Sequence, residues 1–185
     1  MMYAFAGLSG TGKSFLARIF AQVTGLPHFS SDVIRKELAG LQPHESSASI
    51  KGGIYTEELS RRTYGELIQR ASEYPDAILD ATFTSHWQRN MLERAGLPHI
   101  FILCQAPEAV VTNRIQQRQN EPDNPSEAGL DIYFLQQKRF EPFRSHECCM
   151  VVDTFSQSPW SAVISILEVA PPQGESSEQE MEMNR

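Results

Sequence analysis

The chain has 185 residues, of which 41% are hydrophobic and 21% charged, so it is long enough for one domain with a substantial core and resembles a soluble globular protein in composition. Its net charge of −7 argues against a broad surface for nucleic acid or membrane, but leaves room for a small basic pocket. The three cysteines form no disulfide framework, and the N-terminal apolar run is too short for a signal peptide or a membrane span. We therefore expect a cytoplasmic protein in which Cys104, Cys148 and Cys149 are reduced residues of the core.

A phosphate-binding motif lies near the amino end. The apolar run 2–6 predicts a first strand, and residues 7–14 read GLSGTGKS, a complete G-x-x-x-x-G-K-[ST] pattern. The glycines allow the backbone to turn its N–H groups towards an anion, and a predicted helix over 13–24, ended by Gly25, adds the dipole of its N-terminus. Lys13 brings positive charge to the β- and γ-phosphates, and the Ser14 hydroxyl can bind Mg²⁺. The alternative interpretation is a glycine-rich turn without a ligand. We expect nucleotide contacts from Gly7, Ser9, Gly10, Thr11, Gly12, Lys13, Ser14 and Phe15.

The rest of the chain alternates short apolar strands with longer helical segments, which predicts a parallel sheet with helices on both faces. Further strands are expected at about 27–30, 77–79, 99–104 and 150–152, and further helices at about 33–38, 56–72, 85–95, 108–117, 126–140 and 160–169. Two polar segments, 41–53 and 119–124, are expected to be loops. Residues after 170 are acidic and lack apolar periodicity, so we predict one domain over 1–169 and a disordered acidic tail over 170–185.

Five parallel strands with a phosphate loop after the first predict an α/β protein with the P-loop NTPase fold. The expected type is a small kinase with a lid. GTPases and motor ATPases usually carry D-x-x-G after the third strand, whereas here Asp80 is followed by Ala-Thr-Phe. The kinase is therefore the better match.

Asp32 and Arg35 are the candidates for binding and activating an acceptor hydroxyl. Asp32 follows the second strand, so it is expected at the carboxyl edge of the sheet beside the phosphate loop. Residues three apart at a helix start share a face. Asp32 can therefore act as base or orienting group, while Arg35 holds an anionic group of the acceptor. The alternative is that Asp32 only caps the helix and Arg35 is solvated.

Three further side chains are candidates at the same edge. Asp80 ends the third strand and can hold a water of the Mg²⁺ shell or contact the acceptor, or it is simply a strand-end residue. Arg114 and Arg118 lie four residues apart before the polar segment 119–124, where small kinases place a lid. Arg118 is the first choice for reaching the phosphates and Arg114 the second. The alternative is that both only complement the helix dipole.

These motifs together resemble a known family. The segments GLSGTGKS (7–14), SSDVIRKELAGL (30–41), GIYT (53–56) and ILDATF (78–83), with Glu141-Pro142 and Val152-Asp153-Thr154, are similar to the AAA-type ATP-binding domain of predicted P-loop kinases. In other proteins this domain is often fused behind an aminoglycoside-phosphotransferase-like domain. The resemblance covers about 2–154 and implies ATP and Mg²⁺ as cofactors. No N-K-x-D motif for guanine is present in the sequence, which agrees with adenine.

The layout is also similar to the kinase domain of polynucleotide 5′-kinase and, more distantly, to zeta-toxin kinases. In the polynucleotide enzyme a D-x-x-R pair activates the 5′-hydroxyl and binds the acceptor's phosphate. This resemblance implies the same two roles for Asp32 and Arg35.

The leading hypothesis is an ATP- and Mg²⁺-dependent kinase that transfers the γ-phosphate to a hydroxyl of a small-molecule or nucleotide-like acceptor. Lys13, Asp32 and Arg118 are its expected catalytic residues. The alternatives are a nucleotide-binding regulatory ATPase module and a 5′-hydroxyl nucleic-acid kinase, the latter disfavoured by the net charge. The acceptor pocket is expected to form from residues 41–62 and the region after Asp80. The sequence identifies neither the acceptor nor the oligomeric state.

Overall fold

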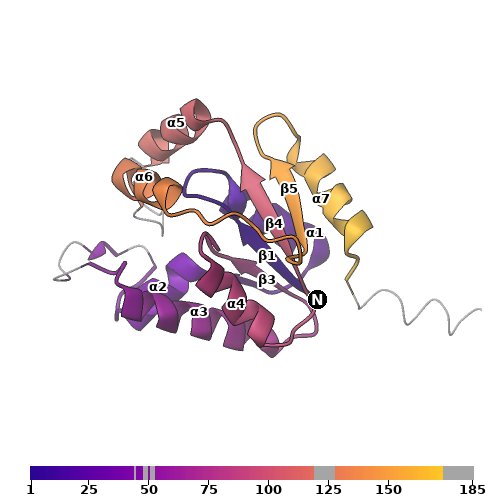
Figure 1. The fold of residues 1–185 in the computed structure, drawn as a ribbon, viewed down its shortest axis with the longest axis horizontal. Coiled ribbons are helices and arrows are strands. Elements are labelled where there is room, and N and C mark those ends of the chain that lie inside the picture. The colour runs from indigo at the N-terminus through magenta and orange to yellow at the C-terminus, as the bar shows by residue number, and fades with distance from the viewer. Residues whose placement is uncertain (44, 48–49, 51–52, 119–127, 173–185) are drawn as a thin grey trace, which may run out of the picture.

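The computed structural model describes residues 1–43, 45–47, 50, 53–118 and 128–172. Its centre is a parallel sheet with strand order β2-β3-β1-β4-β5 (Figure 1). The strands are β1 (Met2–Ala6), β2 (His28–Ser30), β3 (Ala77–Asp80), β4 (His99–Gln105) and β5 (Cys149–Asp153). The predicted five-stranded α/β fold is confirmed.

Seven helices are described around this sheet, and most begin and end within two residues of their predicted bounds. They are α1 (Lys13–Thr24), α2 (Ser31–Leu38), α3 (Glu57–Ser72), α4 (His86–Arg94), α5 (Glu108–Arg118), α6 (Leu130–Lys138) and α7 (Pro159–Val169). Local signals explain several of these bounds. Gly25 ends α1 in the left-handed conformation with φ 69°, and the side chains of Thr56 and Ser158 cap α3 and α7.

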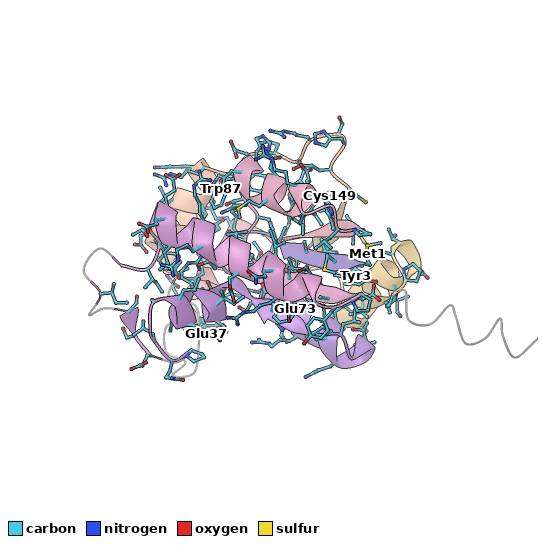
Figure 2. All side chains as sticks on the ribbon, turned by 90° about the horizontal axis from the view of Figure 1, so that it is seen from below. Met1, Tyr3, Glu37, Glu73, Trp87 and Cys149 are labelled. Atoms are coloured by element: carbon cyan, nitrogen blue, oxygen red, sulfur yellow. The ribbon has the colours of Figure 1, made fainter. Side chains whose placement is uncertain are left out.

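Alternate residues of each strand pack on opposite faces of the sheet. Ala4 and Phe101 belong to a core that includes apolar residues of α2, α3 and α4. Phe5 and Ile102 belong to a second core with α1 and α7. Figure 1 shows these two groups of helices on opposite sides of the sheet, and Figure 2 looks onto the side where α3 lies in front, with Glu73 at its end. Because both faces are covered, the strands are rich in apolar residues.

The carboxyl ends of three neighbouring strands bring the candidate residues together. The phosphate loop follows β1, α2 with Asp32 follows β2, and β3 ends at Asp80. Ser30 and Phe5 are both register partners of Asp80 across the sheet. The first residues after β1 and β2 therefore flank Asp80, at the edge where open α/β sheets bind ligands.

Two local predictions were wrong, and the alternative that Asp32 caps α2 is excluded. The N-cap of α2 is Ser30, so Asp32 lies in the first helical turn and its carboxylate bonds to Arg35 instead of capping the helix. α6 begins at Leu130, because Gly129, a poor helix former, is extended at the N-cap position. Cys148 is exposed and Cys149 half-buried, since β5 is an edge strand; Cys104 is buried as predicted.

The predicted lid loop (119–124), the first residues of the predicted helix 126–140, and most of the predicted tail (170–185) lie outside the described residues. Within the described ranges, no helix combines the length and the apolar character needed to span a bilayer.

Candidate active site

The phosphate loop has the tight backbone that its glycines predict. Gly7 has φ 135°, and a Cβ there would lie 2.5 Å from the carbonyl oxygen of Cys104. Gly10 has φ 81°, and a Cβ there would lie 2.8 Å from Ile115 of α5. Both positions therefore exclude a side chain, on conformational and steric grounds. The Gly7 N–H donates to the carbonyl of Thr82 at 3.0 Å, which anchors the start of the loop to the segment after β3.

Lys13, Ser14 and Asp80 meet at one end of this loop. The Ser14 hydroxyl donates to Asp80 Oδ1 at 3.1 Å, and Lys13 Nζ lies 3.8 Å from the same oxygen. His28 Nε2 lies 3.5 Å from Asp80 Oδ2. Burial raises the pKa of Asp80, but the Lys13 charge, His28 and the Ser14 hydroxyl outweigh it and hold the pKa below its usual value. The Asp80 side chain is therefore an ionised, buried carboxylate at neutral pH.

The Ser14 and Asp80 oxygens suit Mg²⁺, which prefers hard oxygen ligands. No cluster of three or more His, Cys, Asp or Glu side chains able to hold a metal is found in the part of the chain that the structure describes. Mg²⁺ at phosphate sites needs only one or two protein ligands, because phosphate oxygens and waters supply the others. The chemistry of these two side chains thus fits a nucleotide-bound Mg²⁺.

The predicted pair Asp32 and Arg35 is also formed. Arg35 Nη1 lies 3.0 Å from Asp32 Oδ1, and the guanidinium carbon lies 5.0 Å from the ring centroid of Tyr55. Arg35 is 7% exposed, and its Nε is buried without a hydrogen-bond partner among the described residues. A buried guanidinium N–H without an acceptor is rare in proteins. Arg35 therefore keeps one guanidinium N–H without an acceptor among the described residues.

Tyr64 of α3 holds the segment after β3, a role that sequence analysis missed. Its hydroxyl accepts a hydrogen bond from Phe83 N–H at 3.1 Å and lies 3.2 Å from Thr82 Oγ1. Phe83 has φ 46°, an unfavourable value for an aromatic residue. Burial raises the pKa of Tyr64, so the hydroxyl is protonated. The local sequence pattern carries no sign of this role.

Arg89 of α4 is a second missed residue. It is fully buried and donates to Glu147 Oε1 at 2.6 Å, to the carbonyl of Phe83 at 2.8 Å, and to the carbonyls of Glu141 and Pro142 at 3.1 Å. The Glu141 carboxylate also accepts from the backbone N–H of His86. The Glu141-Pro142 segment therefore connects the chain after α6 to the turn after β3. No local signal distinguished Arg89 from a solvated arginine.

A cavity of about 280 Å³ opens beside the phosphate loop. It is lined by Gly12, Phe15, Leu16, Arg114, Val152, Thr154, Gln157, Pro159 and Ala162. The predicted site residues Gly12, Phe15 and Arg114 thus line one cavity, whereas Thr154 and Gln157 were not predicted as site residues.

Thr154 connects this cavity to the loop. Its hydroxyl donates to the carbonyl of Thr11, and Arg114 donates to the Thr154 hydroxyl at 3.2 Å and to its carbonyl at 3.0 Å. Arg118, in contrast, donates to the carbonyl of Ala128 at 3.1 Å. Arg114 is therefore held beside the loop, while the role predicted for Arg118 stays a prediction.

Known proteins with related sequences or folds were found. A UPF0200 protein of Aeropyrum pernix is 31% identical over 122 residues, an alignment that covers 64% of this chain and 65% of that protein's length. A sugar kinase from Janibacter sp. has the same fold, with a TM-score of 0.70 at 19% identity over 92% of this chain and 95% of the other. A gluconokinase from Sinorhizobium meliloti gives a TM-score of 0.65 at 18% identity, covering 90% and 89%. These two structures confirm the small-kinase type of P-loop fold. Residues 2–143 match the AAA domain family, and the chain belongs to this family.

Proposed function

We propose that the protein is an ATP- and Mg²⁺-dependent phosphotransferase that moves the γ-phosphate to a hydroxyl of a small acceptor. The observation that carries this proposal is the convergence of Lys13, Ser14 and Asp80 at the loop, with Asp32 following the strand that pairs with Asp80. Phosphoryl transfer needs a phosphate cradle, a metal and a group near the acceptor hydroxyl, and these residues supply candidates for each. The solved structures with this fold include a sugar kinase and a gluconokinase, which supports transfer to a small molecule.

The nucleotide would lie with its base in the 280 Å³ cavity and its phosphates on the loop. Gly12 belongs to both the loop and the cavity lining, so the two sites are continuous. Arg114 borders the cavity and can contact the base or the phosphates. Lys13 provides the charge for the β- and γ-phosphates.

Ser14 and Asp80 would hold Mg²⁺ together with the phosphate oxygens. Bound Mg²⁺ neutralises charge that develops on the transferred phosphate. Asp80 is therefore assigned to the metal side of the site, directly or through a water, because its oxygen already contacts Ser14. His28 Nε2 lies 3.5 Å from the other carboxylate oxygen of Asp80.

The acceptor would lie between the loop and α2. Asp32 retains 21% side-chain exposure and can receive the proton of the acceptor hydroxyl. The Arg35 guanidinium would bind an anionic group of the acceptor, and the Tyr55 ring holds the guanidinium in place. Arg118 remains the candidate for phosphate contact from the lid.

The experiment is to incubate the protein with γ-labelled ATP, Mg²⁺ and a cell metabolite extract, and to identify the compound that gains label. Asp32→Ala should abolish this transfer while calorimetry still detects ATP binding. The matched control is Asp131→Ala, which removes an exposed carboxylate from the first turn of α6. Undiminished transfer by Asp32→Ala would refute the role of Asp32, and absence of ATP binding by the unmodified protein would refute the proposed function.

A further inference from the structure

Gln136 of α6 contacts the phosphate loop directly. Its Oε1 accepts a hydrogen bond from the backbone N–H of Ser9 at 2.9 Å, although 127 residues separate the two in sequence. Figure 1 shows α6 beside the loop that follows β1. Gln136 belongs to no motif of the sequence and has no part in the function proposed above.

The position of Gln136 follows from the packing of α6. Tyr133, one turn earlier on the same helix face, is 3% exposed and clusters with Val111 and Ile115 of α5. Leu8 of the phosphate loop packs against this cluster. The contact between α6 and the loop is therefore apolar as well as polar, and it holds the Gln136 side chain at Ser9.

The other end of the Gln136 amide is a hydrogen-bond donor at the mouth of the loop. A glutamine amide has one acceptor oxygen and an NH₂ group with two donors. Oε1 is used by Ser9, and among the described residues no acceptor is bonded to Nε2. Because Oε1 and Nε2 share one planar group, Nε2 must also lie close to the loop.

Ser9 lies at the end of the loop that a terminal phosphate would reach. Of the loop residues, Gly12 and not Ser9 borders the cavity assigned to the base. A phosphate chain that starts at this cavity and follows the loop away from Gly12 approaches Ser9 with its last phosphate. A neutral amide donor there can bind a phosphate oxygen without adding charge.

We propose that Gln136 contacts the transferred phosphate: Oε1 stays on the Ser9 N–H, and Nε2 donates to a γ-phosphate oxygen of bound ATP. This inference rests on the proposed function. It gives α6 a direct contact with the reacting group that ADP cannot make. Gln136 therefore distinguishes ATP from ADP.

The test is calorimetric titration of the full chain with MgATP and with MgADP. Gln136→Ala should weaken MgATP binding about tenfold or more, the usual effect of losing a hydrogen bond to a charged group, while MgADP binding changes less than about twofold. Gln136→Glu should weaken MgATP binding further, because a carboxylate replaces the donor next to an anion. The matched controls are Gln137→Ala and Gln137→Glu. Gln137 is the exposed neighbour, whose Nε2 donates to Glu108 at 3.1 Å, and both variants should bind like the unmodified protein.

Each other result overturns the inference in a recognisable way. Tighter binding of both nucleotides by Gln136→Ala would mean that Oε1 merely occupies the Ser9 N–H and competes with phosphate. Equal weakening of ATP and ADP, or agreement between the Gln136 and Gln137 variants, would exclude a γ-phosphate contact. If the unmodified protein binds neither nucleotide, the proposed function itself fails. Alanine favours helix, so α6 should persist, and circular dichroism checks this.

Discussion

Two buried ion pairs lie close to the turn after β3, and they differ in how fully their hydrogen-bonding groups are used. Arg89 and Glu147 are both fully buried at 2.6 Å, and the Arg89 guanidinium also donates to three backbone carbonyls. Lys13 Nζ lies 3.8 Å from Asp80 Oδ1. Within the described ranges, its one hydrogen bond is a long 3.5 Å contact to Ser14. His28 Nε2, beside Asp80, has no hydrogen-bond partner among the described residues.

This difference distinguishes an ion pair that stabilises the fold from one that we propose to bind a ligand. Each guanidinium nitrogen of Arg89 already has an acceptor, so this buried pair offers no donor to a ligand. Arg89 and Glu147 therefore serve the structure of the fold. A pair with spare donors at a ligand-binding edge is ready for an anion, as at Lys13. Arg35 belongs with the second kind, because its Nε is buried and unpaired within the described structure.

Removing Arg89 should have the largest effect on stability. Arg89→Met should lower the free energy of unfolding by about 3–5 kcal/mol, because Glu147 is then a buried charge without its partner. Urea denaturation measures this change. The double variant Arg89→Met with Glu147→Leu should recover part of the loss, since the uncompensated charge is gone. Equal instability of the single and double variants would contradict this account.

Removing Lys13 should mainly weaken ligand binding. We expect Lys13→Met to weaken MgATP binding by roughly ten- to 150-fold, the effect of losing a hydrogen bond between charged groups. The loss of unfolding free energy should be smaller than for Arg89→Met. Arg18→Met, which removes an exposed charge from the same helix, is the control and should bind normally. Calorimetry with Mg²⁺ measures the affinities, and unchanged binding by Lys13→Met would remove the basis of the proposed function.

Tyr64 and the buried Arg89–Glu147 pair bond to the same residue. The Tyr64 hydroxyl accepts from the N–H of Phe83, and Arg89 donates to the Phe83 carbonyl. Tyr64→Phe should lower the free energy of unfolding by about 1–3 kcal/mol, since a buried N–H loses its acceptor. Tyr3→Phe removes a hydroxyl that donates to the Ala170 carbonyl in the other core, and it is the matched control. Amide hydrogen exchange at Gly7 should accelerate in Tyr64→Phe alone. Acceleration in neither variant would mean that Tyr64 does not support the loop.

The pH dependence of stability should be the smallest effect. The pKa of Asp80 and of Glu147 is held below the usual values of 3.8 and 4.5, despite burial, mainly by Lys13 and Arg89 respectively. Both carboxylates therefore stabilise the fold above these values, and the stabilisation is lost as pH falls through the lowered pKa values. In Lys13→Met the pKa of Asp80 should rise, so the loss should begin at higher pH. Unfolding curves between about pH 3 and pH 7 test this, and coincident profiles for Lys13→Met and Arg18→Met would contradict it.

Local sequence signals predicted the fold and the edge of the sheet at which several candidate site residues lie. The bounds of α1 were predicted because a phosphate loop precedes it and Gly25 ends it. Asp32, Arg35 and Asp80 were chosen as candidates because the first two follow one recognisable strand and Asp80 ends another. The carboxyl ends of parallel strands share one edge. The start of α6 was predicted too early, because the predicted helix included Gly129, which is the extended N-cap residue in the structure.

The sequence alone determined which residues can bind phosphate and at which edge of the sheet they meet, because strand period, loop pattern and helix caps depend on neighbours along the chain. Only the tertiary structure decided that Gln136 bonds to Ser9 and that each guanidinium nitrogen of Arg89 has an acceptor. It also decided that Arg35 Nε has no acceptor among the described residues. These contacts join residues far apart in sequence, or depend on what the fold leaves unpaired. The local sequence does not reveal such contacts. The residues around a helical arginine or glutamine do not show whether its side chain is solvated or buried against another segment.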